Sequence, residues 1–204
     1  MTFGILLPAL LLAATPPPDA ADLIARLKRP VPASTAYTEV RFVHQLTRPL
    51  ILHGELDYGG ADKLGKRVDA PYHESTTISG DNVTVTRADR TPKHFDLERA
   101  PELKVLMGGF SALLGGDAAA LAVLYTISLV DNAGNWTLTL TPRDAALAAH
   151  LKAFVIDGSG NEPRCFTLQQ ANGDASVMLL GPLAAAKLPQ PPTTAALATL
   201  CRAP

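Results

Sequence analysis

Large apolar side chains alternate with threonines in one segment of the chain, residues 136–142, which reads WTLTLTP. Successive side chains on a strand point to opposite faces, so Trp136, Leu138 and Leu140 share one face and the threonines share the other. An apolar face backed by a polar face is typical of an antiparallel sheet that is solvated on one side. The segment therefore predicts a curved sheet of this kind, whose apolar face is used to bind a ligand.

The same alternation, bounded by turn residues, predicts further strands along the chain. The first two cover residues 35–46 and 50–58, and residues 47–49 between them suit a tight hairpin. The other strands are expected at residues 63–68, 74–79, 83–87, 125–130, 136–141, 152–156, 164–170 and 175–180, with turns at 80–82, 131–135, 157–158 and 172–174. Strands dominate this pattern, so the predicted fold class is mainly β, with helices added (α+β).

Helical patterns occur in two main places. Residues 22–29 place three apolar side chains on one face of a short helix, and residues 101–125 lack alternation of period two. In the second stretch Gly115-Gly116 ends one helix, and Asp117 caps another over residues 118–124. The pair Gly108-Gly109 inside the first of these helices has two interpretations: it lets the helix bend as a lid, or it lets the helix pack close to the sheet.

Composition and charge exclude several classes of function. Lysine and arginine number 18 against 19 acidic residues, so the basic stripe that nucleic acid binding requires is missing. The five histidines are scattered without metal-binding spacing, and no GxSxG or GK[ST] motif is present. We therefore expect no cofactor, no metal site and no nucleic acid partner. The pair His53 and Asp57 is the one hint of an enzyme acting on acyl substrates.

The chain begins with an apolar run from Phe3 to Ala14, followed by a proline-rich stretch. This resembles a secretory signal, although no lysine or arginine precedes the run. The run is shorter than the roughly 20 apolar residues that span a membrane. We interpret residues 1–20 as a signal peptide and linker, which predicts a periplasmic protein; the alternative is a buried N-terminal helix.

Two cysteines, Cys165 and Cys201, complete the set of chemically informative residues. In an exported protein they can pair, and a loop of this length would stabilise the fold by about 3–4 kcal/mol in the chain-entropy model. The alternative is two free, partly buried thiols.

The order of elements resembles the LolA family of periplasmic carriers of outer-membrane lipoproteins, and more narrowly its divergent LolA-like branch. The resemblance runs over residues 20–182 through loosely patterned positions, among them the strand end at 42–45 (FVHQ), Gly54-Glu55-Leu56 and Leu140-Thr141-Pro142. Family members carry an Arg-Pro pair after the G-x-L strand. Here residues 58–64 read YGGADKL, with only Lys63 and Arg67 nearby.

The resemblance implies an unclosed, strongly curved antiparallel half-barrel, with short helices covering its apolar mouth. It also implies a monomeric, non-enzymatic carrier of lipid or lipoprotein acyl chains, with an inner-membrane donor protein and an outer-membrane acceptor protein. The corresponding domain is residues 21–186, followed by a proline-rich tail at 187–204 with one helical turn. An acyl-substrate enzyme of thioesterase type and a structural envelope protein remain as alternatives.

The apolar positions of the predicted strands and of the 101–115 helix are expected to contact the acyl chains, unless they form an ordinary packed core. They are Val40, Phe42, Leu52, Leu56, Ile78, Val83, Val85, Leu106, Phe110, Leu113, Trp136, Leu138, Leu140 and Phe154.

Overall fold

The structure is a computed structural model that describes residues 18–88, 90–132 and 134–203, so the predicted signal peptide lies almost entirely outside the described residues. The strands are β1 (Ala33–Phe42), β2 (Leu50–Tyr58), β3 (Lys63–Ala70), β4 (Glu74–Ser79), β5 (Asn82–Arg87), β6 (Lys93–Asp96), β7 (Tyr125–Asn132), β8 (Asn135–Pro142), β9 (Leu151–Ser159), β10 (Glu162–Gln170) and β11 (Ala175–Leu180). The helices are α1 (Pro18–Arg26), α2 (Pro101–Gly115), α3 (Ala118–Leu124), α4 (Ala145–Ala148) and α5 (Thr194–Arg202), with 3-10 turns η1 (Leu97–Arg99) and η2 (Gly181–Ala185).

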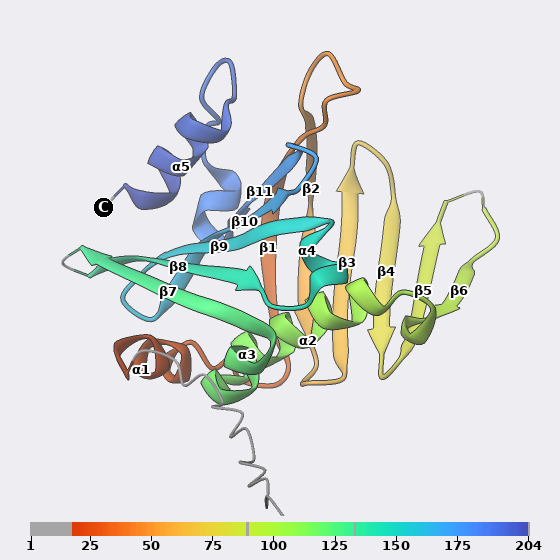
Figure 1. Cartoon of the computed structure of the whole chain (residues 1–204). Coiled ribbons are helices and arrows are strands. Elements are labelled where there is room, and N and C mark those ends of the chain that lie inside the picture. Colours follow the sequence, from red (N-terminus) through yellow and green to blue (C-terminus); the bar gives the residue numbers. More distant parts are fainter. Residues whose placement is uncertain (1–17, 89, 133, 204) are drawn as a thin grey trace, which may run out of the picture.

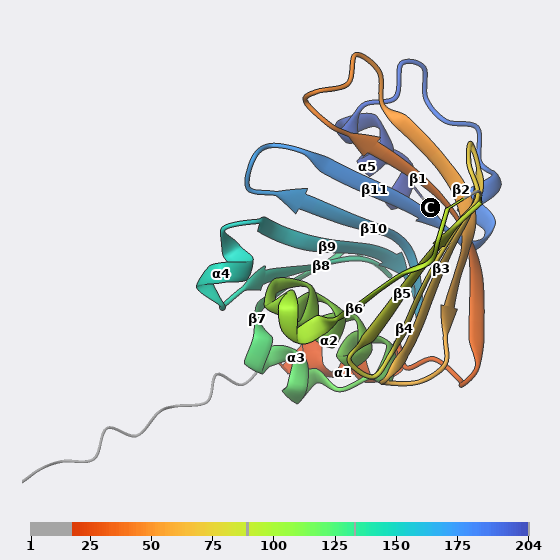
Figure 2. The ribbon, with the colours of Figure 1, turned by 90° about the vertical axis from the view of Figure 1, so that its right-hand side faces the viewer.

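All these strands form one antiparallel sheet of 11 strands, in the order β6-β5-β4-β3-β2-β1-β11-β10-β9-β8-β7. The sheet curves strongly but does not close, because β6 and β7 are its two edges (Figures 1 and 2). Helices α1, α2 and α3 lie at the concave side, whereas α5 lies on the outer side (Figure 2). The expected unclosed half-barrel with short covering helices is therefore confirmed.

Alternation along β8 sets the two faces of the sheet as the sequence predicts. Trp136, Leu138 and Leu140 are buried, and the threonines between them are more exposed. Residues that pair directly across two antiparallel strands share a face. The pairing of Leu138 with Ile156 and of Leu140 with Phe154 therefore extends the buried face onto β9.

Three groups of buried apolar residues follow from this arrangement. The inner core fills the concave side, where α1 to α4 cover β7 to β10 and contribute Leu23, Leu113, Leu121 and Leu147. A small inner cluster lies under η1 and α2 beside β4 and β5. The outer core lies on the convex side, where α5 packs on the sheet. The middle of the sheet is apolar on both faces, so both faces must be shielded from water. Helix α2 shields the concave face and α5 shields the convex face.

The end of α2 and the start of α3 form as the sequence predicts. Asp117 accepts a hydrogen bond from the Ala120 backbone N–H at 2.9 Å and so begins α3. Gly116 ends α2 in the left-handed region with φ +73°, which a residue with a side chain rarely adopts. No helix in the described residues is long and apolar enough to cross a bilayer.

Some predicted boundaries are wrong. Strand β1 ends at Phe42 rather than at residue 46, and the short strand β6 was not predicted. The turn expected at Asp157-Gly158 is absent, because both residues lie inside β9. Residue 158 is glycine for another reason: the ring of Trp136 occupies the space that a side chain there would need. The tail expected from residue 187 contains the full helix α5 rather than one turn, and its Leu197 and Cys201 are buried.

Candidate functional site

The concave face of the sheet is the candidate site, because it collects most of the predicted acyl-binding residues under one helix. From the strands, the inner core takes Leu52, Leu56, Trp136, Leu138, Leu140 and Phe154, and from α2 it takes Leu106, Phe110 and Leu113. Phe110 anchors α2 to the sheet, since its ring centroid lies 4.6 Å from that of Phe154 and 5.7 Å from that of Phe166. The structure thus brings two sequence-distant apolar sets together.

The remaining predicted residues divide between two other places. Ile78, Val83 and Val85 belong to the small inner cluster, where Leu103 and Met107 of α2 contact them. They lie under the N-terminal half of α2, so this helix bridges both halves of the concave face.

Val40 and Phe42 are not on the concave face, and their predicted placement there is wrong. Both belong to the outer core, together with Leu197 and the disulfide between Cys165 and Cys201. Strand β1 carries apolar residues on both faces, so alternation alone does not say which face is inner. Helix α5 covers this part of the convex side, although the sequence pattern predicts a proline-rich tail there.

Helix α2 covers the concave face without being deeply buried itself. Ala112 and Leu113 are buried, whereas the other large apolar side chains of α2 are half-buried: Leu103, Val105, Leu106, Met107, Phe110 and Leu114. One side of α2 faces the ends of β3, β4 and β5, and we call it the β3–β5 edge. Here Lys104 forms an exposed ion pair with Asp81 at 2.8 Å, and the Ser111 hydroxyl donates to the Ala61 carbonyl at 2.7 Å. Both of these contacts are exposed and polar, so water can replace them at little cost.

A groove of about 210 Å³ follows this same edge of α2. Its lining includes the apolar residues Leu64, Ile78 and Met107 and the exposed charged residues Asp81 and Lys104. Its volume is below the roughly 300–1,000 Å³ of sites that enclose a small molecule. An acyl chain would therefore enter the concave face at this groove only if α2 moved away from the sheet.

The two glycines inside α2 have different surroundings. A Cβ on Gly109 would stand 2.5 Å from Cε2 of Tyr125, whereas one on Gly108 would stand 3.4 Å from Leu124 Cδ1. Close packing is thus the reason for glycine at residue 109. The buried Tyr125 hydroxyl beside it has no hydrogen-bond partner in the described part of the chain, and burial raises the pKa of this phenol to about 12.

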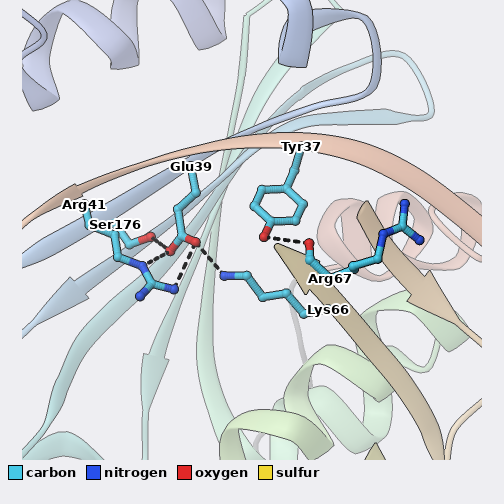
Figure 3. A network of polar contacts seen from close by, with 6 residues as sticks. All are labelled: Tyr37, Glu39, Arg41, Lys66, Arg67 and Ser176. Atoms are coloured by element: carbon cyan, nitrogen blue, oxygen red, sulfur yellow. Dashed lines mark hydrogen bonds and ion pairs between the residues drawn. The ribbon is translucent and has the colours of Figure 1, made fainter. Parts of the chain in front are cut away.

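A cluster of charged side chains lies in the middle of the concave face, which the sequence pattern did not predict (Figure 3). The Glu39 carboxylate accepts hydrogen bonds from Arg41 Nε at 2.8 Å, from Lys66 Nζ at 2.5 Å and from Ser176 Oγ at 2.5 Å. Lys66 Nζ also lies 5.1 Å from the ring centroid of Tyr37. We call Glu39, Arg41, Lys66 and Ser176 the charge cluster.

Electrostatics keep the charge cluster ionised despite its burial. Burial alone would raise the pKa of Glu39, but the hydrogen bonds and positive charges of Arg41 and Lys66 outweigh it and lower this pKa to about 2. Burial lowers the pKa of Lys66, and the Glu39 charge opposes that effect. The side chain of Glu39 is only 4% exposed, whereas that of Arg41 is 36% exposed.

A sequence signal for this cluster exists in β3. Lys66 lies between Leu64 and Val68, so alternation places a lysine within an apolar face. The same parity across the β2–β3 register pairs Lys66 with Leu56. A charged residue at such a position indicates a buried polar partner, which here is Glu39 from β1.

The structure brings together no catalytic set around the histidines that it describes. The His53 ring lies 2.8 Å from Thr38 Oγ1, and no hydrogen bond to Asp57 is present in the described part of the chain. His44 Nδ1 lies 2.9 Å from Asp174 Oδ1, with the His44 side chain 60% exposed. Within residues 18–203, apart from the two omitted positions, no group of three potential metal ligands occurs.

Comparison with known proteins adds a family to this geometry. The family described as outer membrane lipoprotein carrier protein LolA-like matches residues 13–203. The chain belongs to this LolA-like family. A search of curated proteins finds no match.

Three solved structures similar to this LolA-like chain show low sequence identity. A LolA superfamily protein from Nitrosomonas europaea has 11% identity over 87% of this chain and 97% of that chain, with a TM-score of 0.46. LprF from Mycobacterium bovis has 12% identity over 88% and 100%, with a TM-score of 0.34. A putative outer membrane lipoprotein-sorting protein domain from Vibrio parahaemolyticus has 9% identity over 79% and 88%, with a TM-score of 0.41.

The region where this LolA-like chain departs from the family pattern also has a clear place in the structure. Arg67 points to the convex side, where it pairs with Glu55 at 2.6 Å and Asp69 at 2.9 Å. Lys63 shares its parity on β3 and is exposed. Neither cation near the expected Arg-Pro position therefore faces the concave side, whereas Arg41 and Lys66 do.

Proposed function

We propose that this LolA-like chain is a periplasmic, non-enzymatic carrier that holds the acyl chains of a lipid or lipoprotein against its concave face. The single observation that carries the proposal is the pairing of an apolar concave floor with a half-buried apolar helix, α2, in a chain of this family. A helix that is apolar over most of its surface but only half-buried is suited to be a removable cover. Its contacts with Phe154 and Phe166 are of the kind an alkyl chain can replace.

The free energy gained by burying an acyl chain is partly offset by the cost of displacing α2. Burying one methylene group contributes about 0.8 kcal/mol, so a twelve-carbon chain contributes on the order of 9 kcal/mol before any cost is subtracted. Displacement of α2 and immobilisation of the chain then reduce this gain. The net affinity is moderate, which allows the cargo to be released to an acceptor at the outer membrane.

Helix α2 is held at one edge by contacts that are easily broken, so it can move away from the sheet. Its polar ties at the β3–β5 edge, Lys104 to Asp81 and Ser111 to Ala61, are exposed. The groove beside them reaches Met107 and Ile78, so an alkyl chain could begin to enter there. Movement of α2 from this edge would join the groove to the inner core.

The first experiment measures whether the exported protein holds lipid. The chain is purified from the periplasm and analysed by native mass spectrometry, and binding of a fluorescent twelve-carbon acyl probe is titrated. We expect a retained lipid or micromolar probe binding. If there is neither bound lipid nor probe binding, the carrier function is wrong, and a stable protein complex in pull-downs would favour a structural envelope role instead.

A matched pair of variants tests the role of α2. Phe110→Ala removes the ring that holds α2 on Phe154, and Phe42→Ala removes a ring of the same size from the convex side. Because a less stable closed state leaves more of the protein competent to bind, Phe110→Ala should tighten probe binding by about tenfold. Phe42→Ala should leave it within about twofold. Equal effects of the two variants would contradict a cover that opens.

A further inference from the structure

The charge cluster carries more positive than negative charge. One carboxylate, Glu39, faces two cations, Arg41 and Lys66, and the fourth member, Ser176, is neutral. Glu74 also acts on Lys66, but it forms an ion pair with Arg87, so the two together add no net charge. A net positive charge therefore lies on the floor of a largely apolar concave face.

The cluster also has more hydrogen-bond donors than it uses internally. A guanidinium has five N–H donors and an ammonium three. Within the described residues, Glu39 takes Nε and one Nη proton from Arg41 and one proton from Lys66. Both cations keep accessible surface, since the Arg41 side chain is 36% exposed and that of Lys66 is 27% exposed. Their remaining donors point to a ligand that supplies oxygen acceptors and negative charge.

Apolar side chains surround the cluster in register. On the concave face Arg41 pairs with Leu50, Glu39 with Met178, and Ser176 with Leu168. Lys66 likewise pairs with Leu56 across β2 and β3. All four apolar partners are half-buried and pack against the inner core: Leu50, Leu56, Leu168 and Met178. If a charged head group bound at the cluster, its alkyl chain could therefore extend over these side chains to the inner core.

We propose that the charge cluster binds the anionic head group of an acyl lipid, a carboxylate or a phosphate, while its chain lies on the apolar face. The inference rests on the proposed carrier function and adds the chemistry of the cargo to it. A carboxylate or phosphate accepts charge-assisted hydrogen bonds from both cations and neutralises the excess charge. The neutral ester groups of a lipoprotein's lipid anchor would leave that charge unbalanced.

The test compares ligands that differ only in their head group. Displacement of the fluorescent acyl probe is measured with dodecanoic acid, dodecyl phosphate and the uncharged dodecanol, all below their aggregation concentrations at pH 8. We expect both anionic ligands to bind at least tenfold more tightly than dodecanol. Acetate and inorganic phosphate are added as head groups without a chain, and they should compete only at concentrations at least a thousandfold higher.

Two variants of the cluster should change anionic binding in opposite directions. Lys66→Met keeps the length of the side chain but removes one cation, so affinity for dodecyl phosphate should fall about tenfold. Glu39→Gln removes the internal competitor for both cations, so the same affinity should rise severalfold. Affinity for dodecanol should stay within twofold in both. Arg67→Gln, which removes a cation from the convex side, should change neither affinity.

The outcomes separate this inference from the proposed function. If dodecanol binds as tightly as the anionic ligands, the head-group site is wrong and the carrier function stands. If no ligand with a chain binds, the carrier function itself fails. Inorganic phosphate that competes as well as dodecyl phosphate would make the cluster a site for free anions. A loss of affinity in Glu39→Gln, when this variant still unfolds cooperatively on heating, would also overturn the assignment.

Discussion

Gly109 of α2 lies against the ring of Tyr125 at the start of β7, with no room between them for a methyl group. A Cβ on Gly109 would stand 2.5 Å from Cε2 and 2.8 Å from the hydroxyl oxygen of Tyr125. The closed position of α2 therefore depends on the absence of a side chain at residue 109. Its neighbour Gly108 has ordinary van der Waals space, which makes the pair a matched test.

Gly109→Ala should destabilise the closed position of α2. Overpacking of a core typically costs about 1–3 kcal/mol, which exceeds the gain of about 1 kcal/mol in helix propensity. Amide hydrogen exchange of α2 should accelerate by about tenfold or more. Gly108→Ala, which gains the propensity and meets only Leu124 at 3.4 Å, should slow it. Acceleration in both variants would mean that residue 108 also lacks room for a side chain.

Tyr125→Phe should stabilise the protein or leave its stability unchanged. Its hydroxyl is buried without a partner in the described residues, and such a group costs about 1–3 kcal/mol. Removal of this oxygen should raise the free energy of urea unfolding by on the order of 1 kcal/mol. The variant should also favour the closed position of α2 and so weaken acyl probe binding. A loss of stability would show that the hydroxyl makes a hydrogen bond in solution.

Helices and strands could be predicted from the sequence where a periodic apolar pattern is bounded by residues that end such elements. Strands β2, β4 and β11 and helices α2 and α3 begin and end at the predicted residues, because glycine, proline or aspartate marks their ends. Strand β9 shows where this reasoning fails. Gly158 has the appearance of a turn residue, but its glycine is required by the ring of Trp136 on the next strand.

The candidate site could be predicted only in part, because the direction of a face is a tertiary property. Alternation correctly separated Val40 and Phe42 from Glu39 and Arg41 on β1. It could not show that α5 covers the first pair while the second faces the concave side. Alternation also gives no sign that a polar residue on β1 is buried, so it does not predict that Glu39 meets Lys66 from β3 across the intervening strand β2.

Loss of the disulfide should weaken the fold without affecting the concave face. Cys165 and Cys201 are 36 residues apart and join β10 to α5 on the convex side. In the chain-entropy model, a loop of this size contributes about 3–4 kcal/mol to stability. Replacing both cysteines with serine should lower the free energy of urea unfolding by about that amount, with probe affinity of the folded protein within twofold. Dithiothreitol should destabilise the wild type but not this variant.

Stability in acid should depend on Glu39 more than on an exposed carboxylate. Its pKa is about 2 in the folded protein against an ordinary value of 4.5, so the unfolded chain binds the proton more readily. The stabilisation is therefore complete above about pH 5 and is lost as the pH falls towards 2, with a size of about 3 kcal/mol. Urea unfolding of the wild type and of Glu39→Gln should differ most at pH 7, and the difference should shrink at pH 3.

Glu55→Gln is the control, because it removes an exposed carboxylate whose pKa is also lowered, chiefly by hydrogen bonds from Ser34 and Arg67. The difference in unfolding free energy between the wild type and Glu55→Gln should shrink less. A gap between wild type and Glu39→Gln that stays constant from pH 7 to pH 3 would mean that Arg41 and Lys66 do not hold this carboxylate in the folded state.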